Sequence, residues 1–199
     1  MNFLAHLHLS DGSDEGLLGS LMGDFVKGPL DDRYPPGITR GIALHRRIDT
    51  YTDAHAIVLR SKSRISPDRR RFAGIMVDMF YDHFLARDWP TFSGESLPDF
   101  SRRTYALLAQ HHVLLPERLQ RMAPHMIQGD WLGSYAALDA IGSALDGMGR
   151  RMKRENRLHD SVEELVRQYD EFAGDFHAFM PDLIRFAREL HSRSGPLQT

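Results

Sequence analysis

The stretch from Phe72 to Trp89 (FAGIMVDMFYDHFLARDW) constrains the fold more than any other part of the chain. Apolar residues occupy nearly every side of a helix drawn through it, which predicts a helix at the centre of its own domain. Asp78 and Asp82 interrupt that apolar surface one turn apart on a single face, and His83 follows them. Two like charges on a buried face are unfavourable unless a cation neutralises them or a proton binds. The alternative is that they pair with an arginine or cap a neighbouring helix.

The composition is that of an ordinary globular chain. Its 199 residues are 42% hydrophobic and 26% charged with a net charge of −2, so we expect one domain over residues 1–199, and bulk charge indicates no partner. The chain has no cysteine, which excludes disulfides and thiolate chemistry. It shows neither a secretory signal nor an apolar run near the roughly 20 residues of a membrane span. We therefore expect a cytoplasmic protein without membrane association.

Polar residues lie on apolar stripes in two further segments. Residues 15–27 have helical apolar spacing, and Asp24 lies on their apolar stripe near the C-terminal end. In residues 38–52 an isoleucine stripe continues through His45 and Asp49, which are one turn apart. A buried hydrogen bond between histidine and aspartate explains the second segment equally well. The recurrence of the pattern is what favours a shared site.

Imidazole and carboxylate groups aimed into a helical core form the ligand set of a divalent cation such as Mn²⁺, Fe²⁺ or Mg²⁺. Without cysteine, a structural zinc site of the thiolate kind is excluded, and a site rich in aspartate favours a catalytic centre for phosphate chemistry. His6 lies in a segment, residues 2–9, that is too short to assign to helix or strand. The candidate metal ligands are His6, Asp24, His45, Asp78, Asp82 and His83.

The remaining chain also has helical patterns. Residues 98–113, 116–129 and 131–149 predict amphipathic helices, and residues 158–191 predict one long helix or two that are broken at Pro181. No strand alternation is found, so we expect an all-α, single-domain helical bundle. Basic residues gather in residues 60–71 and 150–157, as solvated faces or as docking surfaces for an acidic partner. No signature of a nucleic-acid-binding fold is present.

Four motifs carry a family resemblance: MNFLAHLHLS at the N-terminus, GSLMGDFVKG, PPG-x-x-x-GI-x-x-HRRID-x-x-TD and VDMFYDHFLAR. In this order and spacing, the chain resembles the acyl carrier protein phosphodiesterase family. The resemblance implies a helical variant of the HD-type phosphohydrolase fold. It also implies hydrolytic removal of 4′-phosphopantetheine from holo-acyl carrier protein, an acidic substrate, with Mn²⁺ as the usual metal. The paired motif reads Asp-His rather than His-Asp, so ligand roles are not carried over from ordinary HD enzymes.

The resemblance suggests roles for individual residues. Asp24 or Asp49 is expected to accept a proton from the attacking water, and Arg46 or Arg47 to offset phosphate charge. Docking of the carrier protein is expected at Arg47, Arg69, Arg70 and Arg71. Two alternatives stay open: an HD-type phosphohydrolase of nucleotides or small phosphoesters, and a non-enzymatic helical protein that binds the carrier protein. The sequence indicates neither the oligomeric state nor the number of metal ions.

Overall fold

The computed structural model describes residues 1–193, and within that range the chain is helical and has no strand. The all-α fold predicted from the sequence is confirmed. The predicted single domain extends over residues 194–199, which lie outside the described residues. In chain order the helical segments are α1 (Phe3–His8), α2 (Asp14–Met22), α3 (Pro36–Ala54), α4 (Ala56–Arg64), η1 (Arg70–Phe72), α5 (Ala73–Arg87), α6 (Trp89–Phe92), α7 (Leu97–Gln110), η2 (His112–Leu114), α8 (Glu117–Gln128), α9 (Trp131–Ser134), α10 (Leu138–Arg151), α11 (Val162–Arg167) and α12 (Tyr169–Arg193).

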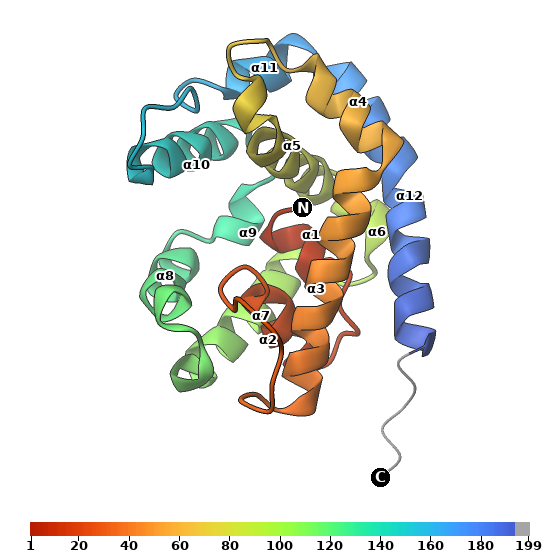
Figure 1. Ribbon diagram of the computed structural model, residues 1–199, viewed down its shortest axis with the longest axis vertical. Coiled ribbons are helices and arrows are strands. Elements are labelled where there is room, and N and C mark those ends of the chain that lie inside the picture. The colour runs from red at the N-terminus through yellow and green to blue at the C-terminus, as the bar shows by residue number, and fades with distance from the viewer. Residues whose placement is uncertain (194–199) are drawn as a thin grey trace.

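Helix α5 lies at the centre of the core, as the stretch Phe72–Trp89 predicts. It contacts α1, α4, α10 and α12, which surround it in Figure 1. Met76, Phe80 and Phe84 are completely buried between these neighbours. Because burial of one such side chain contributes roughly 1.5–3 kcal/mol, the central helix accounts for a large share of the stability.

Helices α2 and α3 run against each other at short range because glycines line their contact. A Cβ atom on Gly19 would lie 2.3 Å from the carbonyl oxygen of Ile38, and one on Gly41 would lie 2.8 Å from that of Gly16. Any larger residue at Gly19 or Gly41 would force the two helices apart. The glycines therefore bring the end of α2 next to the middle of α3, where His45 lies.

The helix predicted over residues 15–27 is shorter in the structure. Helix α2 ends at Met22, so Asp24 lies in the turn that follows. The amides of Phe25 and Val26 still donate to the carbonyl of Met22. The chain therefore keeps turning after the helix, and this is why the apolar spacing extends beyond its end.

Two boundaries in the C-terminal half also differ from the predictions. Helix α12 continues through Pro181, and the break lies at Gln168 between α11 and α12. Phe179 and Leu183 are fully buried on either side of Pro181, and their packing offsets the hydrogen bond that proline cannot make. The segment 131–149 forms α9 and α10 rather than one helix.

The described helices also bear on membrane association. Within residues 1–193, none is both long enough and apolar enough to cross a membrane.

Candidate metal centre

Helix α1 carries His6 into the core, and Asp82 of α5 fixes this helix in place. The two carboxylate oxygens of Asp82 accept hydrogen bonds from the backbone amides of Leu4 and Ala5, at 2.8 and 3.1 Å. These amides belong to the first turn of α1, where backbone donors lack partners within the helix. Asp82 is completely buried, and burial raises its pKa to about 7.

His45 of α3 has the orientation of a metal ligand. Its Nδ1 lies 2.7 Å from the carbonyl oxygen of Ser20, which can only accept, so Nδ1 carries a proton and donates. Nε2 is then directed at two carboxylates, 3.2 Å from Asp49 and 3.6 Å from Asp24. Gly23 leaves room for the ring, because a Cβ there would lie 2.2 Å from Cγ of His45. A backbone carbonyl holding the second ring nitrogen is typical of metal-binding histidines.

His6 lies flat against His45. The two rings stack with centroids 3.6 Å apart and planes tilted by 14°. Nε2 of His6 lies 3.0 Å from Oδ1 of Asp49, but the contact lacks the alignment of a hydrogen bond. Both ring nitrogens of His6 are thus buried without a hydrogen-bond partner among the described residues. Such groups cost free energy unless something else satisfies them.

The pKa values of the two histidines are shifted in opposite directions. Burial lowers the pKa of His6 to about 4. Burial also acts to lower the pKa of His45, but the nearby carboxylates of Asp24 and Asp49 outweigh it and raise that pKa to about 9. Burial acts to raise the pKa of Asp49, but contacts with both histidines hold it well below its usual range. Near neutral pH, the cluster therefore contains one imidazolium, one neutral imidazole and two carboxylates.

Asp78 borders this cluster through the first residue of the chain. The α-amino group of Met1 lies 3.1 Å from Oδ1 of Asp78 and 3.6 Å from Oδ1 of Asp49. Burial raises the pKa of Asp78, although the charge of this amino group opposes the shift. Asp78 and Asp49 therefore share one positive neighbour.

The donor set fits one divalent cation. One nitrogen of His6, one of His45 and one oxygen of Asp49 all lie within 4.8 Å of one another. Adjacent ligand atoms around an octahedral cation with bonds of about 2.1 Å lie about 3.0 Å apart, close to the 3.0 and 3.2 Å contacts of Asp49 with the two histidines. A cation would also satisfy the buried Nε2 of His6. We call His6, Asp24, His45 and Asp49 the α1–α3 cluster.

Comparison with known proteins matches the sequence to one family. A family model described as acyl carrier protein phosphodiesterase matches residues 1–183. The chain belongs to this family. Proteins named acyl carrier protein phosphodiesterase share 37% identity with it in Photorhabdus laumondii (94% of this chain, 95% of that protein). They share 37% in Yersinia enterocolitica (95% and 98%) and 35% in Escherichia coli (94% and 97%). No solved structure matches at a significant level, so the HD-type relationship stays a prediction.

Two candidate ligands from the family's DHF motif have other contacts in the structure. Asp82 uses both oxygens on α1, as described above. His83 is also engaged at both nitrogens: Nδ1 donates to the carbonyl of Tyr135 at 2.9 Å, and Nε2 accepts from the hydroxyl of Tyr169 at 2.8 Å. The structure therefore brings His6, Asp24 and His45 together, with Asp78 beside them, and gives Asp82 and His83 partners elsewhere.

The arginines proposed from the sequence fall into two groups. Arg46 donates to the carbonyls of Gly28 and Val26, so it ties α3 to the loop that follows Asp24. Arg69 lies 3.5 Å from Glu164, and Arg70 donates to the carbonyl of Ile65. Arg47 and Arg71 are exposed. Their roles in catalysis or docking stay predictions.

Sequence reasoning placed Asp49 among the catalytic groups and left its role as a ligand open. Its spacing from His45 was the available signal, since residues four apart on a helix are neighbours. The contact with His6 gave no signal, because α1 and α3 are far apart in the chain. The supporting roles of Ser20 and Gly23 were also missed, since a backbone carbonyl and an absent side chain leave no chemical signature in a sequence.

Proposed function

We propose that the protein hydrolyses the phosphodiester that links 4′-phosphopantetheine to a serine of holo-acyl carrier protein, releasing the apo form. Membership of the acyl carrier protein phosphodiesterase family supports the substrate. The observation that carries the chemistry is the α1–α3 cluster, in which two imidazoles and two carboxylates converge at a half-exposed position. The cytoplasmic location expected from the sequence stays a prediction.

We also propose that the cluster holds Mn²⁺, with Mg²⁺ and Fe²⁺ as alternatives. His6, His45 and Asp49 would hold it, and Asp24 lies beside them, 3.6 Å from Nε2 of His45. When bound, such a cation supplies Lewis-acid stabilisation of phosphate charge and an activated water. The preference for Mn²⁺ rests on the family resemblance.

The chain's own groups divide the remaining work. Asp49 orients both imidazoles, because each of its oxygens faces one of them. Asp24 is the more exposed carboxylate, with half its side chain open to solvent, so it is positioned to accept a proton from the attacking water. Water then adds to phosphorus, the bond from phosphorus to the serine oxygen breaks, and that oxygen takes up a proton. The products are apo-acyl carrier protein and 4′-phosphopantetheine.

Mass spectrometry of holo-acyl carrier protein tests this proposal. Incubation with the protein and Mn²⁺ should lower the carrier's mass by one phosphopantetheine group, and a chelator should abolish the loss. An unchanged carrier mass, with the metal bound, would contradict the proposed substrate. A screen of nucleotides and small phosphoesters without carrier protein would then test the alternative phosphohydrolase. A carrier that binds without losing mass would favour the non-enzymatic alternative.

A further inference from the structure

A cavity of about 450 Å³ lies between α1, α9 and α10, and we call it the α9–α10 cavity. Its size is within the roughly 300–1,000 Å³ typical of small-molecule sites. Trp131, Tyr135 and Met148 form part of its lining, together with Phe3 of α1. Figure 1 shows α9 beside α1, with α10 above it on the same side of the molecule. Small residues of α10, including Gly147, leave the space open.

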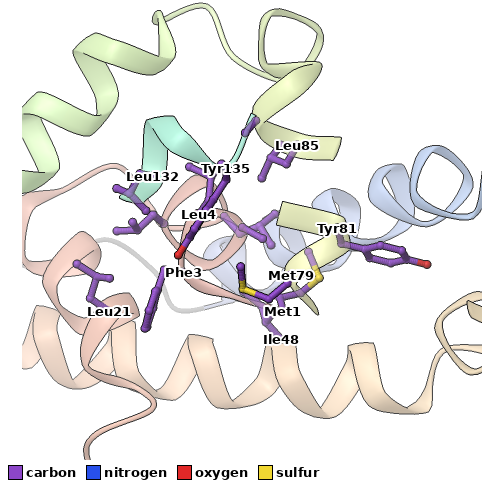
Figure 2. Close-up of a cluster of buried hydrophobic side chains, with 14 of the residues drawn as sticks. Met1, Phe3, Leu4, Leu21, Ile48, Met79, Tyr81, Leu85, Leu132 and Tyr135 are labelled. Carbon is purple, nitrogen blue, oxygen red and sulfur yellow. The ribbon is translucent and has the colours of Figure 1, made fainter. Parts of the chain in front are cut away.

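Helix α1 contributes one residue to the cavity and one to the α1–α3 cluster. Phe3 lines the cavity and His6 belongs to the cluster, and residues three apart lie on the same face of a helix, about one turn from each other. The side-chain amide of Asn2 donates to the hydroxyl of Tyr135 at 3.3 Å, which links the start of α1 to the cavity wall. Figure 2 shows Phe3 and Tyr135 next to each other in this part of the core.

The lining suits a long ligand that is mostly uncharged. Trp131, Tyr135 and Met148 offer aromatic and flexible apolar surface, while the exposed Ser143 offers a hydroxyl. The chemistry of a pantetheine arm matches this lining. The arm carries a dimethyl group at one end, two amides with methylenes between them, and a thiol at the other end. Hydrogen bonding at a few points within an apolar wall is the usual design of such sites.

The charge at the cavity's edge fits an anionic substrate. Arg150 and Arg151 line the cavity, are exposed, and form no salt bridge with any described residue. In the other basic run, Arg60 and Arg64 are paired with Asp175. The unpaired positive charge therefore lies beside the cavity, where it can attract an acidic carrier protein.

We propose that the α9–α10 cavity binds the pantetheine arm of the carrier protein's prosthetic group, while Arg150 and Arg151 face the acidic carrier. The inference rests on the proposed function, because it takes the phosphate to be bound at the neighbouring α1–α3 cluster. It adds a subsite that recognises the released group rather than the scissile bond.

Direct binding provides the first test. The chain has two tryptophans, Trp131 in the cavity and Trp89, which is buried elsewhere in the core. Titration with pantetheine, which lacks the phosphate and the carrier, should give a saturable change in tryptophan fluorescence. The change should vanish in Trp131→Phe, whose fold is checked by circular dichroism. No change in the wild type, or the same change in Trp131→Phe, would overturn the proposal.

Filling the cavity provides the second test. A Cβ on Gly147 would meet nothing closer than 3.4 Å, and one on Gly174 of α12 would meet nothing within 4 Å. Gly147→Leu and Gly174→Leu are therefore matched substitutions, and both favour the helix. Gly147→Leu fills the cavity with four carbon atoms and should lower kcat/KM for holo-acyl carrier protein by at least about tenfold, since even one methylene in a pocket changes this ratio by about that much. Gly174→Leu should leave kcat/KM unchanged.

These outcomes separate this inference from the proposed function. Unchanged kcat/KM in Gly147→Leu, with an active wild type, would overturn the cavity assignment and leave the proposed function standing. An inactive wild type would overturn the proposed function. The pantetheine titration would then decide on the cavity alone, since it requires no turnover.

Discussion

At the scale of single residues, Asp49 is the side chain that contacts both histidines. Its Oδ1 lies 3.0 Å from Nε2 of His6, and its Oδ2 lies 3.2 Å from Nε2 of His45. The histidines come from α1 and α3, so only a group between them can serve both. Without Asp49, the cluster would keep two stacked imidazoles and lose the carboxylate nearest to each.

Asp49→Asn should therefore weaken Mn²⁺ binding and lower turnover of holo-acyl carrier protein by about a hundredfold or more, since even residues that only support a ligand cost 10- to 100-fold. Paramagnetic resonance of free Mn²⁺ measures the affinity. Asp53→Asn is the matched control, because Asp53 lies on the same helix one turn further and is mostly exposed. Equal affinity in wild type and Asp49→Asn would remove Asp49 from the site.

Asp82 supports the cluster from a distance. Its oxygens hold the amides of Leu4 and Ala5, and His6 follows them in α1. Asp82→Ala leaves these two buried donors unpaired and should lower the free energy of unfolding by about 2–3 kcal/mol. Urea denaturation measures the loss. The exposed Asp139→Ala should change stability by less than about 1 kcal/mol. An equally small effect for Asp82→Ala would show that α1 is held by other contacts.

The sequence predicted the α1–α3 cluster in part. The stripe of α3 correctly indicated that His45 faces inward. The stripe over residues 15–27 predicted that Asp24 also faces inward, but Asp24 lies after the end of α2 and half of its side chain is exposed. The stripe of α5 correctly indicated that Asp82 is buried. A stripe indicates which side chains are buried, but it does not indicate which atoms they meet there. The role of Asp82 and His83 as metal ligands therefore stays a prediction.

At the scale of whole helices, a network of ion pairs and hydrogen bonds around the buried Asp175 joins α4, α5 and α12. Asp175 of α12 is almost completely buried and accepts hydrogen bonds from Arg64 at 2.9 Å and from Ser61 at 2.8 Å, and Arg60 lies 2.5 Å away. Ser61 also lies 2.8 Å from the hydroxyl of Tyr81 on α5. The network fixes three helices by charge and direction, whereas apolar packing alone leaves their rotation less defined.

Asp175→Asn should destabilise the protein by about 1.5–3 kcal/mol, because it weakens the charged hydrogen bonds to two arginines that are themselves partly open to solvent. Burial acts to raise the pKa of Asp175, but the hydrogen bonds from Arg64, Arg60 and Ser61 outweigh it and lower that pKa below 3.8. The contribution is therefore present above pH 3.8 and is lost as the pH falls through the lowered folded value. Asp170→Asn, exposed on the same helix, is the control.

Thermal unfolding of wild type and Asp175→Asn from pH 3 to pH 7 measures this difference. The gap in unfolding free energy should be constant near neutral pH and should narrow below about pH 4. A gap that stays constant down to pH 3 would show that the carboxylate's charge is not what stabilises the network.

The position of the helices was largely predictable, and their ends were less so. Periodicity located α3 and α5 within a few residues, because their apolar stripes are long. The end of α2 and the break at Gln168 were not predicted, since a non-helical turn can continue apolar spacing and a buried proline can be tolerated. The pairing of α1 with α5 was also beyond the sequence, because periodicity indicates burial without naming the partner.

The two basic runs differ at the scale of the whole molecule. In residues 60–71, most arginines bind groups of the same chain, including Asp175 and Glu164. In residues 150–157, Arg150 and Arg151 have no such partner among the described residues and lie at the α9–α10 cavity. The two runs are alike in composition. Only the fold shows which arginines pair within the chain and which remain available to bind a partner.

Reversing both charges, in Arg150→Glu with Arg151→Glu, should raise KM for the carrier protein about tenfold at low salt and reduce its salt dependence. Arg71→Glu, at the exposed end of the other run, tests the docking expected there from the sequence. Steady-state kinetics between low and high salt measures both effects. A larger effect of Arg71→Glu would move the docking surface to residues 60–71.

Anomalous X-ray scattering from crystals soaked in Mn²⁺ tests the central claim most directly. The account predicts a peak between Nε2 of His6, Nε2 of His45 and the carboxylate of Asp49. Asp146, His159 and Asp160 form a second group of potential ligands at the surface and serve as an internal comparison. A peak only at this second group, or none at the α1–α3 cluster, would contradict the account.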